Sequence, residues 1–312
     1  MYAALPHLTS VWMVMVAGVT LAFLSVQFGF LMHDAGHGAV FDAPWMNDLF
    51  GLICGDLLAG LSYRWWAPHH REHHVNPNSP TADPDIVDLD VVFAYTERSA
   101  AARRGLRGLI VRHQHNLIFP GFLGQGFAML FYSIRYLVGE RPPYWWAELI
   151  VMLAHYVAYG FLVFTLLPVR SAVPLVVVHR LLVGLYTSLV VATNHMGMAR
   201  ADLELLPDYI ARQAATSRNV RNPAWLDFFF AGLNFQIEHH LFSAMPRPHL
   251  RQAKLIVERF CAERGVIYHE TSLWIALMEM RQYLRSIGDS ARRNSSDLPG
   301  GSHSSEPAGL TQ

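Results

Sequence analysis

The fold of this chain is decided by Val11-Trp-Met-Val-Met-Val-Ala-Gly-Val-Thr-Leu-Ala-Phe-Leu-Ser-Val-Gln-Phe-Gly-Phe-Leu-Met32, followed directly by His33-Asp-Ala-Gly-His37. At about 1.5 Å of rise per residue, a helix over 11–32 is roughly 33 Å long, which is enough to cross the apolar core of a bilayer. Residues i and i+4 of a helix share one face, so the two histidines can bind one metal ion, or one ion each of a close pair. The stretch predicts a membrane protein with a metal site at the end of a span.

The composition of the whole chain supports this prediction. Of 312 residues, 52% are hydrophobic and only 15% are charged, and the mean hydropathy is +0.22; an average soluble domain is less apolar and more charged. The formal net charge is zero, so nothing suggests nucleic acid as a partner. The two cysteines, Cys54 and Cys261, are far apart and form no motif, which fits a reducing compartment without a disulfide framework.

Further apolar stretches extend the pattern beyond the first span. Residues 146–167 and 172–193 are predicted to cross the membrane, and the short Pro-containing turn between them makes them an antiparallel hairpin. Residues 45–61 are shorter and are interrupted by three glycines and Asp56. Residues 117–138 are interrupted by glycines, Pro120 and Arg135, so both of these stretches are weaker candidates.

Two more histidine clusters lie further along the chain, in His70-Arg-Glu-His73-His74 and in Gln236-Ile-Glu-His239-His240. Adjacent residues on a helix diverge by about 100°, so each His-His pair can serve two metal ions. Imidazole is a good ligand for iron, copper, zinc and nickel, and seven clustered imidazoles are more than one ion needs. The three clusters therefore predict a two-metal site.

Three residues near the ends of the spans and boxes add to this prediction. His195 ends the span over 172–193 and is an eighth candidate ligand. Asn194 and Gln236 are candidates for contacts that hold a ligand or a water molecule, because the neighbours of metal ligands commonly orient them.

A shared site requires the three clusters to lie on one side of the membrane. Residues 45–61 and 117–138 then cannot cross once, and they are predicted to be interfacial or re-entrant. Most arginines fall on the cluster side, which makes that side cytoplasmic by the positive-inside rule. The expected fold is an all-α membrane protein, with transmembrane and interfacial helices and a cytoplasmic helical cap that holds a histidine-rich di-metal site. The expected divisions are an integral-membrane domain over 1–287, with the cap formed by 62–116 and 199–287, and a disordered Ser/Gly/Pro-rich tail over 288–312.

The acidic run and the histidine clusters each have an alternative interpretation. The acidic run from Asp83 to Asp90 resembles a hard-cation site, but a solvated loop with helix-capping aspartates is favoured, with one aspartate supporting the metal ligands. A lone His-x-x-x-His is common by chance, whereas three clusters in order are not. A histidine-rich membrane metal transporter would place its ligands near mid-membrane, and here they lie at span ends.

The boxes resemble those of the membrane-bound fatty acid desaturase family over roughly residues 11–285. The second box extends as Trp65-Trp66-Ala-Pro-His-His70-Arg-Glu-His73-His74-Val-Asn-Pro-Asn78, followed by Asp83-Pro-Asp85. The third reads Asn234-Phe-Gln236-Ile-Glu-His239-His240-Leu-Phe-Ser-Ala-Met-Pro246-Arg247. Glutamine at the start of the third box is similar to the front-end and bacterial acyl-CoA or acyl-lipid desaturase branch.

This resemblance implies an O2-dependent oxidoreductase that introduces a cis double bond into an acyl-CoA or acyl-lipid chain. It implies two non-haem iron ions, an external electron donor (a ferredoxin, a cytochrome b5-like protein or an NAD(P)H-dependent reductase) and a site in the bacterial inner membrane that faces the cytoplasm. The same boxes occur in related hydroxylases and monooxygenases, which remain the alternative. The ligands implied by position are His33, His37, His70, His73, His74, His195, His239 and His240.

Two departures from the family carry expectations of their own. Eukaryotic front-end enzymes often contain a fused cytochrome b5 domain with a His-Pro-Gly-Gly motif, and this sequence contains none, so a separate electron donor is expected. The family usually has two spans before the first box, whereas one is counted here. We therefore expect that the chain begins late.

Overall fold

A computed structural model describes residues 10–200, 208–221 and 223–296 of the chain, with the side chains of 291–296 left aside. The first half contains α1 (Val11–Gly36), α2 (Pro44–Leu52), the π-helical η2 (Ile53–Ala59), α3 (Tyr63–Val75), α4 (Pro84–Leu89), α5 (Glu97–Ala102) and α6 (Gly105–Glu140). The second half contains α7 (Trp145–Leu166), α8 (Val169–His195), α9 (Tyr209–Thr216), β1 (Asn219–Arg221), η3 (Ala224–Leu226), α10 (Asp227–Phe230), α11 (Gln236–Leu241), α12 (Arg247–Arg264), β2 (Glu270–Ser272) and α13 (Leu273–Ser296).

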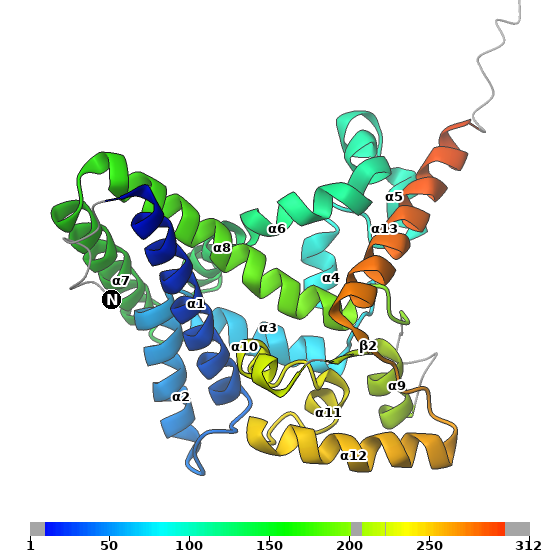
Figure 1. Ribbon diagram of the computed structural model, residues 1–312. Coiled ribbons are helices and arrows are strands. Elements are labelled where there is room, and N and C mark those ends of the chain that lie inside the picture. Colours follow the sequence, from blue (N-terminus) through cyan, green and yellow to red (C-terminus); the bar gives the residue numbers. More distant parts are fainter. Residues whose placement is uncertain (1–9, 201–207, 222, 297–312) are drawn as a thin grey trace, which may run out of the picture.

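The described part of the chain is nearly all helical, as predicted. Its strands are β1 and β2, which form a short parallel pair with Val220 opposite Thr271. Figure 1 shows α1, α2 and α7 grouped on one side of the molecule and α5, α9, α12 and α13 on the other, with α6 and α8 running between them. The all-α prediction is confirmed.

Four of the described helices are long and apolar enough to cross a membrane, namely α1, α6, α7 and α8. Three of them coincide within a few residues with the predicted spans over 11–32, 146–167 and 172–193. Their mutual packing is apolar: Val14 and Leu21 of α1, Val163 of α7 and Leu175 of α8 belong to one buried cluster. These helices form the membrane part of the fold.

The predicted stretch over 117–138 is part of a longer helix, because α6 runs unbroken from Gly105 to Glu140. Residues 105–116, expected in the cap, belong to the same helix as 117–138. One of the glycines that suggested an interrupted stretch, Gly126, is a packing contact: a Cβ on Gly184 of α8 would lie 2.6 Å from the carbonyl oxygen of Phe122 and 2.7 Å from the nitrogen of Gly126. Small residues let membrane helices approach closely in this way.

The position of the histidines limits how many helices cross. The boxes in α3 and at the end of α8 lie together, so an even number of crossings separates His74 from His195. Helices α6, α7 and α8 therefore cannot all cross completely. The surface location of residues 117–138, and the interfacial location of 45–61 (which form α2 and η2), stay predictions.

The cap is built by helices that pack around the ends of α6 and α8. Ile118 of α6, Met196 after α8 and Met280 of α13 share one buried cluster. The expected disordered tail over 288–312 is wrong at its start, because α13 continues to Ser296. The rest of the tail, like residues 1–9, 201–207 and 222, lies outside the described residues.

Candidate metal centre

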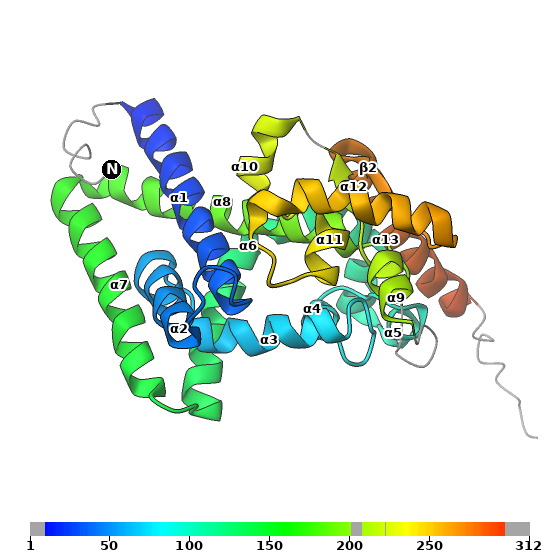
Figure 2. The same cartoon turned by 90° about the horizontal axis from the view of Figure 1, so that it is seen from below.

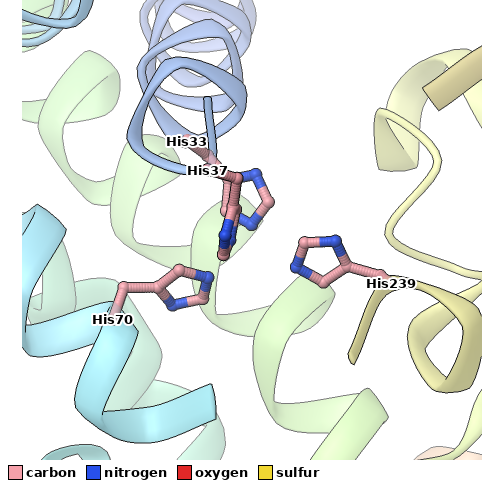
Figure 3. Close-up of side chains that lie close together, drawn as sticks. All are labelled: His33, His37, His70 and His239. Carbon is pink, nitrogen blue, oxygen red and sulfur yellow. The ribbon is translucent and has the colours of Figure 1, made fainter. Parts of the chain in front are cut away.

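Four of the predicted ligands come together from three separate helices. His33 and His37 come from the end of α1, His70 from α3 and His239 from α11, and one ring nitrogen of each lies within 4.8 Å of the others. Figure 3 shows the four rings facing one another across a common space. We call these four residues group A.

A second group lies next to the first. His73 of α3, His195 of α8 and His240 of α11 also bring their nitrogens within 4.8 Å of one another, and we call them group B. The Nε2 atom of His195 is 3.3 Å from that of His73 and 3.1 Å from that of His240. The adjacent His239 and His240 of α11 thus point into different groups, as their helical phase of about 100° requires.

His74 lies between the two groups. Its Nε2 atom is 3.0 Å from that of His70 in group A, and its ring stacks on that of His240 in group B at a centroid distance of 4.1 Å. The structure therefore gathers all eight histidines that the sequence selected. Their role as ligands stays a prediction, because it depends on the metal.

The outward nitrogens of group B are each hydrogen-bonded to the surrounding protein. Nδ1 of His73 lies 2.9 Å from a carboxylate oxygen of Asp83, Nδ1 of His195 lies 3.1 Å from the carbonyl oxygen of Thr216, and Nδ1 of His240 lies 2.9 Å from Oε1 of Gln213. When Nδ1 carries the hydrogen, Nε2 keeps its lone pair for a metal ion. The protein thus selects the tautomer that metal binding needs.

Asp83 corrects the prediction that the acidic run is solvated. Its side chain caps α4 by accepting from the backbone nitrogen of Asp85, as a capping aspartate should, but it is fully buried. It also accepts from the backbone nitrogen of Asn78 at 2.7 Å. Asp83 is therefore buried, and it takes the role expected of one aspartate in the run by holding His73 of group B.

Asn78 and Gln213 connect this support to the rest of the site, and the sequence did not single out either for this role. The Asn78 side chain donates to the carbonyl oxygens of His195 and Thr216, both at 3.0 Å. Gln213 donates from Nε2 to the carbonyl oxygen of His74 at 2.9 Å while its Oε1 accepts from His240. Asn78 stands in the extended second box, whereas Gln213 lies in α9, outside every motif, so only its position in space identifies it.

Gln236 and Asn194 lie where the sequence placed them, next to His195. One atom of the Gln236 amide is 2.8 Å from Nε2 of His195, and its other atom accepts from Asn194 at 3.0 Å. Asn194 also donates to the carbonyl oxygen of Leu233. The amide of Gln236 therefore reaches the inner side of group B.

The end of α8 is held by a buried arginine. The fully buried Arg218 donates to the carbonyl oxygens of Thr193 and Met196, which flank His195, and forms an ion pair with Glu279 of α13. These contacts fix the helix end that carries His195.

Group A is held mainly by ring packing. Trp66 stacks on His70 at a centroid distance of 4.5 Å and lies 5.4 Å from His33. The contact between Nδ1 of His33 and Asp34 is 3.3 Å long, and Asp34 also pairs with Arg247 of α12. Arg247 thereby ties the end of α1 to the cap.

The protonation of these rings suits a metal site. Burial lowers the pKa of His37 to about 2, and burial together with neighbouring imidazoles holds the pKa of His70, His74, His239 and His240 well below the usual value. Burial also opposes protonation of His73, but the nearby Asp83 carboxylate outweighs it and raises the pKa of His73 to about 9. A metal ion would displace that proton, as metal binding to histidine generally does.

Several inner nitrogens lack a protein partner. Within the described chain, Nε2 of His33, His37 and His239 and Nδ1 of His74 are buried without a hydrogen-bond partner. Leaving a buried polar atom unsatisfied typically costs about 1–3 kcal/mol, and a metal ion would remove that cost. Imidazoles with free inward nitrogens fit one or two transition-metal ions.

A family model and curated relatives relate this chain to the same kind of protein. A sequence model of the family described as Fatty acid desaturase matches residues 10–272. The chain is similar to the Delta 8-(E)-sphingolipid desaturase of Emericella nidulans, with 28% identity over 299 residues that cover 89% of this chain and 54% of the relative. It is also similar to the Acyl-lipid (9-3)-desaturase of Physcomitrium patens, with 29% identity over 286 residues, covering 89% and 54%. The chain spans about half the length of these curated relatives.

Proposed function

The chain belongs to the fatty acid desaturase family, and we propose on that basis that it is an O2-dependent oxidoreductase that introduces a cis double bond into an acyl chain. The observation that carries the proposal is the convergence of eight histidines, from α1, α3, α8 and α11, in one cluster. It is a membrane protein with the cluster at the ends of two candidate spans, α1 and α8.

We propose that groups A and B, bridged by His74, hold two iron ions. The rings of His33, His37, His70 and His239 would hold one ion and those of His73, His195 and His240 the other, with Gln236 and Asn194 supporting them. Iron, when bound, would supply the oxidising power to remove hydrogen from an unactivated methylene with O2. The reaction balances as one –CH2–CH2– unit, O2, two electrons and two protons giving one –CH=CH– unit and two waters.

The residues of the chain have three tasks in this reaction. Burial keeps His37, His70, His74, His239 and His240 neutral and keeps water away from the metal ligands. Asp83, Gln213 and the carbonyl of Thr216 hold group B rings in the tautomer that turns Nε2 inward. Since a methylene offers no polar handle, the apolar part of the protein has to hold the acyl chain at a fixed depth beside the cluster.

We propose a lipid-linked acyl chain as the substrate in preference to acyl-CoA. The names of the relatives refer to sphingolipid and acyl-lipid desaturases. A lipid-linked chain starts in the bilayer, which the apolar helices of this protein contact directly. The chain length and the position of the double bond follow from the experiment below.

The orientation and the electron donor are also proposals. The distribution of arginines supports a cluster that faces the cytoplasm, as in a bacterial inner membrane. Two electrons per turnover would come from a donor protein such as a ferredoxin, a cytochrome b5-like protein or an NAD(P)H-dependent reductase.

The test is expression in a host with simple fatty acids, with mass spectrometry of the lipids. A new double bond in a lipid-linked acyl chain, dependent on O2, is expected. Feeding labelled lipid or labelled acyl-CoA to reconstituted protein with electron donors distinguishes the two substrate classes. A hydroxylated product would favour the related hydroxylases, and no product with functional donors present would contradict the proposal.

A further inference from the structure

An aromatic segment on the cap is exposed although it is strongly apolar. It consists of η3 and α10, residues Ala224–Phe230. Trp225 is 66% exposed, Phe228 63% and Phe229 40%. Contiguous apolar surface of this kind in a soluble region marks an interaction site, so the surroundings of the segment decide its partner.

The segment lies beside the middle of a membrane span. The ring of Phe23 in α1 is 5.9 Å from that of Phe228 and 5.4 Å from that of Phe229, and Figures 1 and 2 both place α10 next to α1. Phe23 is nine residues before Met32, which corresponds to about 14 Å along the helix. Half of the hydrocarbon core of a bilayer is about 15 Å thick, so α10 reaches membrane depth.

The backbone at the end of α10 is satisfied by polar side chains of the spans. Tyr186 of α8 donates to the carbonyl oxygen of Phe229. Gln27 of α1 donates to the Tyr186 hydroxyl at 3.0 Å and to the carbonyl oxygen of Phe228 at 3.5 Å. Backbone that enters the hydrocarbon region without spanning it needs such partners. The two hydrogen bonds of Gln27 also explain why a glutamine stands in this largely apolar span.

Charged side chains surround the start of the aromatic segment. Asp227 at the start of α10 pairs with Arg251 of α12, and Glu270 pairs with Arg221 and Lys254. The three cations line a cavity of about 140 Å³ next to the segment. Lys254 also pairs with Glu258 at 4.0 Å, so three cations face three carboxylates and the base of the segment is charged but balanced.

We propose that residues 224–230 insert into the bilayer as a re-entrant wedge beside α1 and α8, with phospholipid as the partner. The acyl chains of the lipid contact Trp225, Phe228 and Phe229. Part of the region assigned to the cytoplasmic cap is then a membrane segment. The wedge does not depend on the reaction that the metal centre carries out.

Collision measurements on a spin label test the wedge. Trp225→Cys and Phe228→Cys are labelled in the full chain in phosphatidylcholine nanodiscs, and collisions with O2, which enters hydrocarbon, are compared with those of a water-soluble nickel chelate. Val19→Cys on α1, which is 53% exposed, gives the lipid reference, and Arg259→Cys on α12, 81% exposed, gives the water reference. The unsubstituted chain measures labelling of the buried Cys54 and Cys261.

The expected ratio of O2 to nickel collisions at 225 and 228 matches that at 19 and is several-fold above that at 259. A ratio like that at 259 would place the segment in water and overturn the wedge. Low collision rates with both reagents would show that protein covers the segment, such as a second copy of the chain, and would also overturn it.

A charge substitution gives an independent test that does not need labelling. Phe228→Asp is expected to lower the Tm of the reconstituted chain by more than Ile256→Asp, because a carboxylate in hydrocarbon is costly and one on the water-facing side of α12 is not. Ile256 is a matched control, since it is 72% exposed. Equal shifts for the two variants would contradict the wedge.

Discussion

Groups A and B contain the same kind of ligand but are held in different ways. Each ring of group B has its outward nitrogen hydrogen-bonded, to Asp83, Gln213 or the carbonyl of Thr216. In group A the rings of His33 and His70 pack against Trp66, and the contact of His33 with Asp34 is long at 3.3 Å. Hydrogen bonds fix both the tautomer and the orientation of a ring, whereas packing fixes mainly its position. Group B is therefore the more preorganised half of the centre.

Removal of a histidine ring should cause the largest loss of bound iron and of activity, and the loss should be the same in groups A and B. His240→Ala in group B and His37→Ala in group A each remove a proposed ligand from a centre that needs two ions. Each loss of activity should exceed the about 10–100-fold that follows loss of an outer partner. Bound iron and desaturated product are measured, with the exposed His113→Ala as the control. Unchanged iron and activity in both ligand variants would refute the metal assignment.

Asp83→Asn tests the support of group B directly. The amide no longer supplies the negative charge that favours the Nδ1–H tautomer of His73, so iron affinity or activity should fall about 10–100-fold. Iron titration of the purified chain measures this. Asp88→Asn, in the short helix α4 that Asp83 caps, is the matched control and should change little. A loss of less than twofold for Asp83→Asn would mean that packing alone suffices in group B.

Gln213→Leu should lower turnover and iron affinity by less, by about 10-fold. The substitution removes a neutral partner of His240 and a hydrogen bond to the backbone of His74, but no charge. Turnover and iron content are compared with those of Gln252→Leu, an exposed glutamine in α12. If the two variants behave alike, α9 does not contribute to the centre.

Asp34→Asn should lower iron affinity the least, by under about 10-fold. Its contact with His33 is long, and the packing of Trp66 remains in the variant. The measurement is the same iron titration used for Asp83→Asn. A loss as large as that of Asp83→Asn would erase the difference between the two groups.

The sequence predicted the members of the centre better than their surroundings. The eight histidines followed from local spacing and from the end of a span, and all eight meet in the structure. One aspartate of the acidic run was expected to support the ligands, but the sequence did not say that it is Asp83 or that it is buried, because its burial depends on how α4 packs against α3. Gln213 was not identified at all, since a single glutamine in a short polar helix has no local pattern that distinguishes it.

In the membrane part too, local patterns predicted some features and missed others. Apolar length predicted α1, α7 and α8, because the width of a bilayer sets the length of a span. It did not give the extent of α6, where Pro120 and the glycines suggested an interrupted stretch but the helix is continuous. Gly126 instead allows close packing on Gly184 of α8, a contact between residues about 60 positions apart.

The sequence by itself determined that this is a helical membrane protein with paired histidines at helix ends, because hydropathy and the 3.6-residue period are local properties of the chain. Only the tertiary structure decided how the histidines divide between the two groups. His70 joins His33, His37 and His239, while His73, one turn later, joins His195 and His240. That division depends on the angles at which α1, α3, α8 and α11 meet, and those angles are set by packing between residues distant in the chain.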